Sequence, residues 1–165
     1  MAAKHPLALS IADLAAAYRS GEAQPLKVTE LALDRIARYD KELHSFVTLT
    51  GEVALRQAKK AQDELAGGID RGPLQGVPIA LKDLYSTKGI RTTAHSRVLL
   101  DHVPREDATA VAKLHECGAV FLGKLAMHEF AYGGPGVDSA FPPARNPWNR
   151  GHVTGGSSSG SGAAV

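Results

Sequence analysis

The sequence predicts an α/β fold that begins with a helical arm. Apolar residues follow helical spacing through the first two-fifths of the chain. Beyond Gly72-Pro73, two compact apolar runs flank a helix-like segment that ends at a glycine. A strand, a helix and a second strand in this order favour parallel pairing within one sheet. The 165 residues are enough to bury one core, so we expect one domain, with the arm at residues 1–70 and the start of the α/β core at residues 71–165.

The first two helices of the arm have clear boundary signals. Ser10 is a suitable N-cap, with Asp13 three residues on in capping-box register, and the helix that follows ends at Gly21. Pro25 can begin a second helix, because proline is tolerated in the first helical turn. Helical spacing predicts that this helix runs to about Tyr39, and its apolar positions are Val28, Leu31, Ala32 and Ile36.

A strand and a third helix complete the arm. The stretch Phe46–Leu49 is rich in strand-forming residues. After it, apolar residues recur at helical intervals until Gly67-Gly68, which closes the helix. This apolar face consists of Ala54, Ala58, Ala61 and Leu65.

The core region supplies two strands around a helix. Residues 77–82 form an apolar run bounded by turn residues, which we interpret as a buried strand. Asp107 can cap a helix at residues 108–116, and residues 119–122 indicate a second buried strand. Residues 133–162 are rich in Gly, Pro, Ser and Asn and lack apolar periodicity. Such a long irregular segment is usually functional or disordered.

Composition and charge argue against several classes of protein. Nineteen basic and seventeen acidic residues give a net charge of +2, and aromatics make up 5%. These values do not favour a nucleic acid or an anionic membrane as a partner. No apolar run or secretory signal points to a membrane or to export, and the single Cys117 cannot form an internal disulfide. The seven histidines show no metal-binding spacing, so we assign no metal and no cofactor and expect a cytoplasmic protein.

Lys82 is the first candidate for chemistry because it ends the apolar run of the first core strand. Burial disfavours the ammonium form and lowers the pKa of a lysine. An ordinary lysine is neutral in only about one copy in 2,500 at pH 7, so a buried Lys82 would be a far better general base. The alternative is a strand-end lysine that pairs with Asp83 or another acid.

A glycine- and serine-rich turn at residues 154–162 is the second candidate. Its glycines allow close backbone approach, its serines supply hydroxyls, and it leads towards an expected helix N-terminus. The alternatives are a flexible linker and a phosphate-binding loop. The Walker pattern needs a lysine that this turn lacks, and the dinucleotide fingerprint needs a strand where residues 146–151 lie instead.

Taken together, Lys82, Pro78 and the triple-serine turn resemble the amidase signature family. The resemblance covers most of the chain from Ile11 onward, and the 75 positions between Lys82 and Ser157 are typical of the family. Blocks that match in the family's order are residues 72–83, 118–124, 127–131, 139–141, 145–149 and 155–160.

This resemblance implies an architecture and a mechanism. The fold would be a mixed, largely parallel sheet flanked by helices, and this chain would be the N-terminal part of a single amidase-signature domain. The activity would be hydrolysis of a carboxylic amide by a Ser-Ser-Lys mechanism. Lys82 would be the neutral base, and Ser157, which follows a cis peptide in the family, would pass a proton between the lysine and the nucleophilic serine.

The resemblance also implies where the substrate binds. The substrate-binding positions would be Met127, Gly133, Gly134 and Ser158. For Met127, packing is the alternative, because methionine commonly fills gaps in a core. Asp138 and Ser139 lie in a loop where they could cap the backbone or contact substrate. We expect Trp148 to pack its loop rather than bind a ligand.

The family's nucleophilic serine lies about two dozen residues after the bridging serine, and that position falls past Val165. Ser158, Ser159 and Ser161 do not match it. We therefore expect the N-terminal portion of an amidase, with two of three catalytic residues and no turnover by itself. Its partner would be a small-molecule amide, and it would form a homodimer or need the missing C-terminal portion.

Two further hypotheses stay open. One is the A subunit of a glutamyl- or aspartyl-tRNA amidotransferase, although Gly133-Gly134-Pro135-Gly136 replaces the serine pair and asparagine expected there. The other is a non-catalytic fragment, an interaction module or a nucleotide-binding module that uses the Gly/Ser turn.

Overall fold

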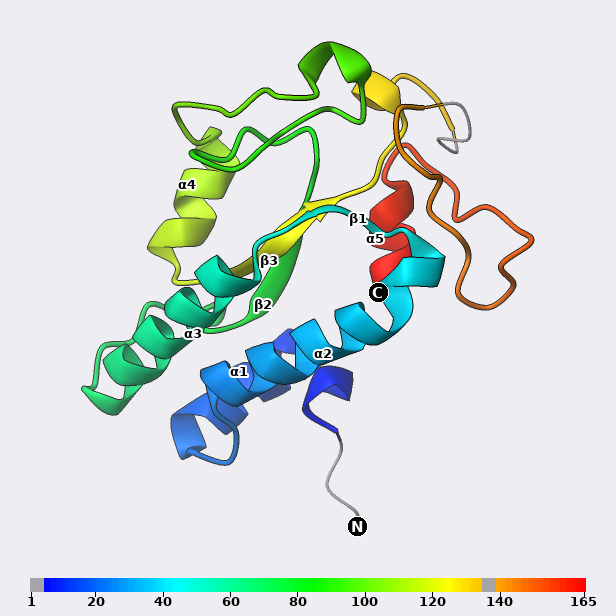
Figure 1. The fold of residues 1–165 in the computed structure, drawn as a ribbon. Helices are drawn as coiled ribbons and strands as arrows, with labels where there is room; N and C mark the ends of the chain where they lie inside the picture. Colours follow the sequence, from blue (N-terminus) through cyan, green and yellow to red (C-terminus); the bar gives the residue numbers. More distant parts are fainter. Residues whose placement is uncertain (1–4, 135–138) are drawn as a thin grey trace. The chain divides into compact units, whose positions relative to one another are not determined.

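The computed structural model describes residues 5–134 and 139–165 (Figure 1). Their secondary structure confirms the α/β class. The helices are α1 (Ile11–Ser20), α2 (Pro25–Leu43), α3 (Gly51–Ala66), α4 (Thr109–Glu116) and α5 (Ser159–Ala164). The strands are β1 (Phe46–Leu49), β2 (Pro78–Lys82) and β3 (Val120–Leu125), and short 3-10 helices lie at Pro6–Ala8, Arg97–Leu99 and Glu129–Ala131.

The three strands form one mixed sheet in the order β1-β3-β2. β1 and β3 are antiparallel, with Phe46 opposite Leu125. At one end of β2, the Val120 amide donates to the Val77 carbonyl (2.9 Å). At the other end, the Asp83 amide donates to the Leu125 carbonyl (3.0 Å). The residue numbers rise together along both strands, so β2 and β3 run parallel, as expected for two strands joined through a helix.

The chain divides into two compact units, and strands β2 and β3 contribute residues to both. The first unit comprises residues up to 36, residues 50–79 and residues 112–122. The second comprises residues 37–49, 80–111 and 123–165. The predicted division into an arm at 1–70 and a core at 71–165 stays a prediction.

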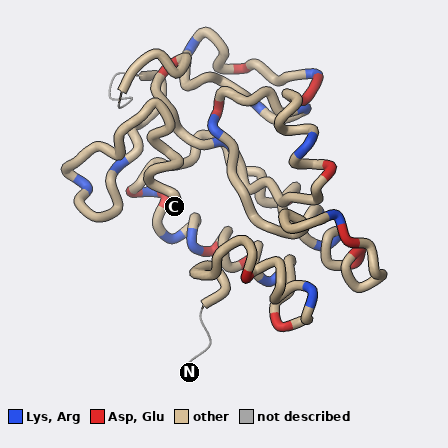
Figure 2. Tube along the Cα trace, turned by 180° about the vertical axis from the view of Figure 1, so that it is seen from behind, with Lys and Arg blue, Asp and Glu red and all other residues tan. Residues whose placement is uncertain are grey.

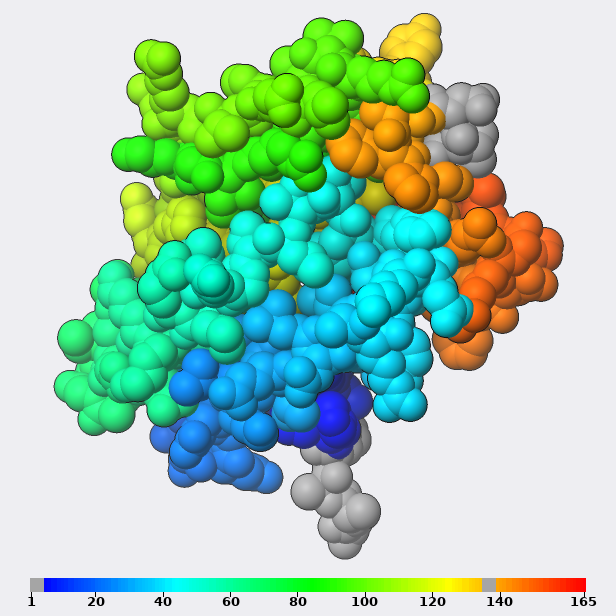
Figure 3. All heavy atoms as spheres, in the orientation of Figure 1, coloured from blue at the N-terminus to red at the C-terminus, as the bar shows by residue number. Residues whose placement is uncertain are grey.

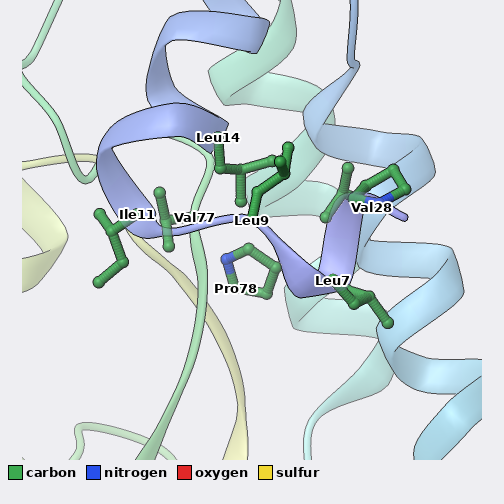
Figure 4. A pocket seen from close by; sticks show the side chains of 8 residues that line it. Leu7, Leu9, Ile11, Leu14, Val28, Val77 and Pro78 are labelled. Atoms are coloured by element: carbon green, nitrogen blue, oxygen red, sulfur yellow. The ribbon is translucent and has the colours of Figure 1, made fainter. Parts of the chain in front are cut away.

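In the first unit, α1 and the start of α2 bury their apolar faces against the residue that precedes β2. This cluster consists of Leu14, Tyr18, Val28 and Val77. Pro6, Leu7 and Leu9 lie over it and line a small apolar pocket of about 150 Å³ (Figure 4). Burial of these side chains, at roughly 25 cal/mol per Å², is what fixes the helical arm to the strand.

The ends of α1 confirm the sequence-based prediction. The Ser10 hydroxyl accepts a hydrogen bond from the Asp13 amide (3.1 Å) and donates one to the Asp13 carboxylate (2.7 Å). At the other end, Gly21 has φ 77° and closes the helix in the left-handed conformation that glycine adopts without strain. The α1 helix is therefore capped at both ends by residues that the sequence already indicates.

In the second unit, α5 packs its backbone directly against the segment that follows β3. The Gly160 amide donates to the Ala126 carbonyl (2.8 Å), and the Ala126 amide donates to the Ser45 carbonyl (2.8 Å). A Cβ at Gly160 would lie 2.4 Å from the Ser45 carbonyl oxygen, so only glycine fits there. Ala163 of α5 joins Ala126 and Ala144 in a small buried cluster.

Three elements extend beyond their predicted limits. β3 continues through Gly123 and Lys124 to Leu125, because Lys124 is buried with a charged partner and does not end the strand. α2 continues past Tyr39 to Leu43, and α5 already begins at Ser159. In each case the helix or strand continues through polar or glycine-rich residues, which sequence patterns ordinarily assign to a turn or loop.

Basic and acidic residues both lie along α3 (Figure 2). Its ion pairs are Glu52–Arg56, Lys59–Asp63 and Lys60–Glu64, each at i,i+4 spacing. The exposed pairs Glu52–Arg56 and Lys59–Asp63 contribute about 0.3–0.5 kcal/mol each, whereas Glu64 is largely buried and also pairs with Arg71. Within the described residues, no helix has both the length and the apolar character needed to cross a membrane.

Candidate active site

Lys82 and Ser157, which are 75 positions apart in the sequence, are in direct contact. The Lys82 Nζ lies 2.7 Å from the Ser157 Oγ, within hydrogen-bond distance. Lys82 is the last residue of β2 and is half-buried. Burial lowers the pKa of Lys82 below its ordinary value, so its neutral form is more populated than that of an exposed lysine.

The backbone around Ser157 is fixed on both sides. The peptide bond between Gly156 and Ser157 is cis. The Ser157 carbonyl accepts a hydrogen bond from the His128 amide (2.9 Å), and α5 begins two residues later at Ser159. The Gly160 contact with Ala126 then holds the first turn of α5 in place. These contacts direct the Ser157 hydroxyl towards Lys82.

Asp83 does not pair with Lys82, so the alternative of a structural Lys82–Asp83 pair is wrong. The Lys82 amine contacts Ser157, while Asp83, the first residue after β2, lies in the interior. There it is fully buried and pairs with Lys124, whose Nζ lies 3.4 Å from the Asp83 Oδ1. The sequence did not single out Lys124 as a charged site residue. Its place two residues after the apolar run of β3 was the available signal.

A second polar pair joins the buried His95 to the partly buried Ser139. The Ser139 Oγ lies 2.9 Å from the Nδ1 of His95, and the ring of Phe141 stacks on the His95 ring with centroids 4.9 Å apart. Burial lowers the pKa of His95, while the nearby Asp83 and Glu129 carboxylates oppose that shift. His95 is therefore largely neutral near pH 7 and anchors Ser139.

The predicted substrate-binding residues differ in their exposure. Met127 is completely buried, which agrees with the packing alternative, and its role towards substrate stays a prediction. Gly133, Gly134 and Ser158 are exposed. Ser158 is the N-cap residue of α5, but its hydroxyl makes no capping hydrogen bond. Pro135, Gly136 and Asp138, which the sequence also singles out, lie outside the described residues.

Trp148 does not pack its loop, so that expectation is wrong. Its side chain is 95% exposed. The loop is held instead by its own polar groups: the Asn146 Oδ1 accepts from the Trp148 amide (2.9 Å), and the Asn149 Oδ1 accepts from the Gly151 amide (3.0 Å). Asn and Asp side chains stabilise turns in this way without burying apolar surface. Figure 3 shows this segment, coloured orange, at the surface.

The described residues contain no group of three or more His, Cys, Asp or Glu side chains that could hold a metal ion. They do contain the Lys82 amine, whose pKa is lowered, in contact with the Ser157 hydroxyl. Lys82 ends strand β2, and Ser157 lies just before helix α5. Such a pair can accept and return a proton.

Comparison with known proteins assigns this arrangement to a family. The family model described as Amidase matches residues 27–165. The chain belongs to the amidase family. The match includes both Lys82 and Ser157, so the contact between them lies inside the amidase region.

Curated relatives of this amidase chain are A subunits of glutamyl-tRNA(Gln) amidotransferases. It is 48% identical over 157 residues to the glutamyl-tRNA(Gln) amidotransferase A subunit of Geobacter metallireducens, and 47% identical over 156 residues to that of Methylococcus capsulatus. These alignments cover 95% and 94% of this chain and 32% of each relative. The chain therefore spans about a third of the length of the curated relatives it matches.

Solved structures support the same fold. The peptide amidase of Stenotrophomonas maltophilia superposes with a TM-score of 0.88 at 35% sequence identity. That superposition covers 96% of this chain and 34% of the peptide amidase. The α/β architecture described above is therefore part of the amidase-signature fold.

Proposed function

We propose that this chain supplies the lysine and the bridging serine of an enzyme that hydrolyses carboxylic amides by a Ser-Ser-Lys mechanism. The observation that carries the proposal is the 2.7 Å contact between the Lys82 Nζ and the Ser157 Oγ. The lowered pKa of Lys82 supports it, because a proton acceptor must be neutral before it can act.

The proposed reaction moves one proton through the pair twice. As a nucleophilic serine attacks the amide carbonyl, its proton passes to the Ser157 Oγ while the proton of Ser157 passes to the Lys82 amine. When the tetrahedral intermediate collapses and the C–N bond breaks, the proton returns through Ser157 to the leaving nitrogen. Water then attacks the acyl-enzyme by the same route and releases the acid, which restores the serine.

We infer that the nucleophile is a serine other than the three beside Ser157. Ser158 is exposed at the N-cap of α5, and Ser159 is buried within that helix. Neither matches the family's nucleophile position, and Ser161 does not match it either. The 165 residues alone are therefore expected to show no turnover, and activity requires the further serine from a longer amidase domain.

A chimera tests this assignment directly. The 165 residues would be joined to the part of the Geobacter metallireducens relative that follows the aligned region, and amide hydrolysis by this chimera would be compared with that of the 165 residues alone. We expect ammonia release from the chimera only. Hydrolysis by the shorter protein that depends on Ser158, Ser159 or Ser161 would overturn the assignment.

Matched variants of the chimera then test the two residues. Lys82→Met and Ser157→Ala should each lower kcat by at least about 100-fold, the usual range for loss of a general base or proton relay. Lys59→Met removes an exposed lysine of α3 and should leave kcat unchanged. Equal activity in all three variants would remove Lys82 and Ser157 from the mechanism.

A second candidate function is that of an amidotransferase A subunit, which would release ammonia from glutamine. The sequence identity of 43–48% to several glutamyl-tRNA(Gln) amidotransferase A subunits favours this second function. The replacement of the expected serine pair and asparagine by Gly133-Gly134-Pro135-Gly136 argues for a different substrate site.

Substrate preference separates the two candidates. An amidotransferase A subunit should hydrolyse glutamine and bind partner subunits, whereas a free-standing amidase should prefer other amides and purify alone or as a homodimer. We propose that Met127, Gly133, Gly134 and Ser158 form part of the substrate site in either case. Neither function predicts affinity for ATP or NAD, so binding of either in calorimetry would instead favour a nucleotide-binding role for the Gly/Ser turn.

A further inference from the structure

A buried ion pair, Asp83–Lys124, lies directly after the end of β2, and the proposed proton transfers do not use it. Lys124 is 1% exposed and Asp83 is 0% exposed. Burying two charges costs free energy that the pair alone seldom recovers, so a retained pair of this kind often fixes one arrangement of the chain. The contacts of this pair indicate which segments it holds in place.

The ammonium group of Lys124 bridges two segments that follow Lys82. Its Nζ donates to the Tyr85 carbonyl (2.8 Å) and to the Thr92 Oγ1 (2.6 Å), in addition to its 3.4 Å contact with the Asp83 Oδ1. The Tyr85 amide in turn donates to the Lys82 carbonyl (3.1 Å). Lys124 thus holds the turn at residues 82–85 from its carbonyl side.

Asp83 fixes the same turn through its backbone and its carboxylate. Its amide donates to the Leu125 carbonyl, and its carbonyl accepts from the Ala94 amide, both at 3.0 Å. Its Oδ2 accepts from the Thr93 amide (2.9 Å) and from the Thr93 hydroxyl (2.5 Å). The residue that directly follows Lys82 therefore has contacts at its amide, its carbonyl and its side chain.

We propose that Asp83 and Lys124 are positioning residues that hold the backbone of Lys82 so that its amine meets Ser157. This inference rests on the proposed function, because it assigns a purpose to the Lys82–Ser157 contact. Proton relays need their groups held within about 0.5 Å, and supporting residues commonly provide that precision. Without the pair, the turn at residues 82–85 loses its anchors and the Lys82 amine moves into solvent.

The test is the titration of Lys82 in the 165-residue chain, followed by NMR of the lysine Cε–Hε resonances. The Lys82 signal is identified by its loss in Lys82→Met. In Lys124→Met and in Asp83→Asn we expect the Lys82 midpoint to rise towards the ordinary lysine value of about 10.4. The double variant Asp83→Asn/Lys124→Met leaves no unpaired charge, and its Lys82 midpoint should still be raised because the Tyr85 and Thr92 contacts remain lost.

Controls separate positioning from loss of stability. Val111→Ala opens a cavity at a fully buried position of α4 and should lower the melting temperature without moving the Lys82 midpoint. Thr92→Val is the substitute test if Lys124→Met does not fold. It removes one hydrogen-bond acceptor of the Lys124 ammonium and should raise the Lys82 midpoint by a smaller amount. A midpoint unchanged in every folded variant overturns the inference.

The two proposals fail in different ways. If Lys82 already titrates near 10.4 in the unmodified chain, the proposed role of Lys82 as a base is wrong. If Lys82 titrates low in the unmodified chain and equally low in the variants, only the positioning role of Asp83 and Lys124 is wrong.

Discussion

Two lysines on neighbouring strands illustrate how one residue type takes two roles. Burial lowers the pKa of both Lys82 and Lys124, but the nearby Asp83 carboxylate opposes the shift for Lys124 alone. The Lys124 ammonium also has a carbonyl and a hydroxyl as acceptors, which favour its charged form. Lys82 faces the Ser157 hydroxyl instead. Both lysines therefore have a lowered pKa, but the partners of Lys124 oppose that shift, whereas Lys82 faces a hydroxyl that can exchange a proton with it.

At this scale we predict a pH dependence of stability. A lysine whose pKa is lowered by folding loses its proton more readily in the native state, so the unfolded state binds more protons between the lowered pKa and about 10.4. The free energy of unfolding should therefore rise with pH in that window, and it should rise less in Lys82→Met. Urea unfolding at a series of pH values measures this difference.

The exposed Lys59 provides the control for this measurement. Lys59→Met removes a lysine that pairs with Asp63 rather than with Ser157, so the contribution of Lys82 to the pH profile should remain in this variant. A profile of Lys82→Met that runs parallel to the unmodified one would contradict the lowered pKa of Lys82.

The residues of this site could be predicted from the sequence only in part. Lys82 is conspicuous because it ends an apolar run, and its pairing with Ser157 followed from the resemblance to a family. The Lys124–Asp83 pair was missed because charged residues ordinarily end a buried strand, and nothing local shows that partners 41 positions apart neutralise each other. The available clue was the place of Lys124 two residues after the apolar run at residues 119–122.

Among the elements, the caps of α1 and α5 differ in a way that can be measured. Ser10→Ala removes a hydroxyl that caps the Asp13 amide and should cost about 1 kcal/mol of stability. Ser158 is the equivalent N-cap residue of α5, but its hydroxyl makes no capping hydrogen bond. Ser158→Ala should therefore leave the free energy of unfolding nearly unchanged. Chemical denaturation of both variants tests the contrast, and equal losses would contradict it.

The placement of α5 depends on a residue without a side chain. Gly160→Ala would push a methyl group against the backbone of Ser45 and Ala126, which cannot move aside as a flexible side chain could. We expect a loss of about 3 kcal/mol, at the upper end of the usual cost of overpacking, and a displaced Ser157 hydroxyl. Thermal unfolding measures the loss, and the Lys82 titration reports the displacement.

Gly134→Ala is the matched control for this prediction. Among the described residues, a Cβ at Gly134 would meet no atom within 4 Å, so the variant should unfold at the same temperature as the unmodified chain. If Gly160→Ala unfolded at that temperature too, the close approach of α5 to Ala126 would be disproved.

The elements themselves followed the sequence where local signals are strong. Ser10, Asp13 and Gly21 set the limits of α1. The glycines and the proline at residues 72–76 correctly indicated that β2 follows. The limits failed where a polar stretch stays regular: β3 continues through Gly123-Lys124, and α5 begins inside the serine run at Ser159. In both cases long-range contacts outweigh local preference, since the Lys124 charge has partners and Gly160 has a backbone neighbour.

For the whole molecule, the exposed aromatic side chains bear on self-association. Phe130, Tyr132 and Trp148 of the second unit are exposed, and Trp148 is the single tryptophan of the chain. Exposed apolar side chains favour contacts with other molecules. We propose that the chain forms dimers at raised concentration in the absence of further amidase sequence.

Tryptophan fluorescence tests this proposal. At low concentration Trp148 should emit as a solvated indole, and urea unfolding should barely shift its emission. If dimers cover Trp148, its emission should move to shorter wavelength as the protein concentration rises, and sedimentation velocity should show a larger species. Trp148→Glu and Tyr132→Glu should weaken that association, and a mass independent of concentration in the unmodified chain would contradict it.

The alternation of Lys82 and Asp83 about the strand end also constrains how this molecule can change. A single-residue insertion or deletion in β2 would turn each side chain to the other side of the sheet. A one-residue deletion would bring Asp83 to the place of Lys82, facing the Ser157 hydroxyl, whereas a one-residue insertion would bring Lys82 to the place of Asp83, buried beside Lys124. A change of one residue in the length of this strand would therefore either replace the base by an acid or bury two like charges together.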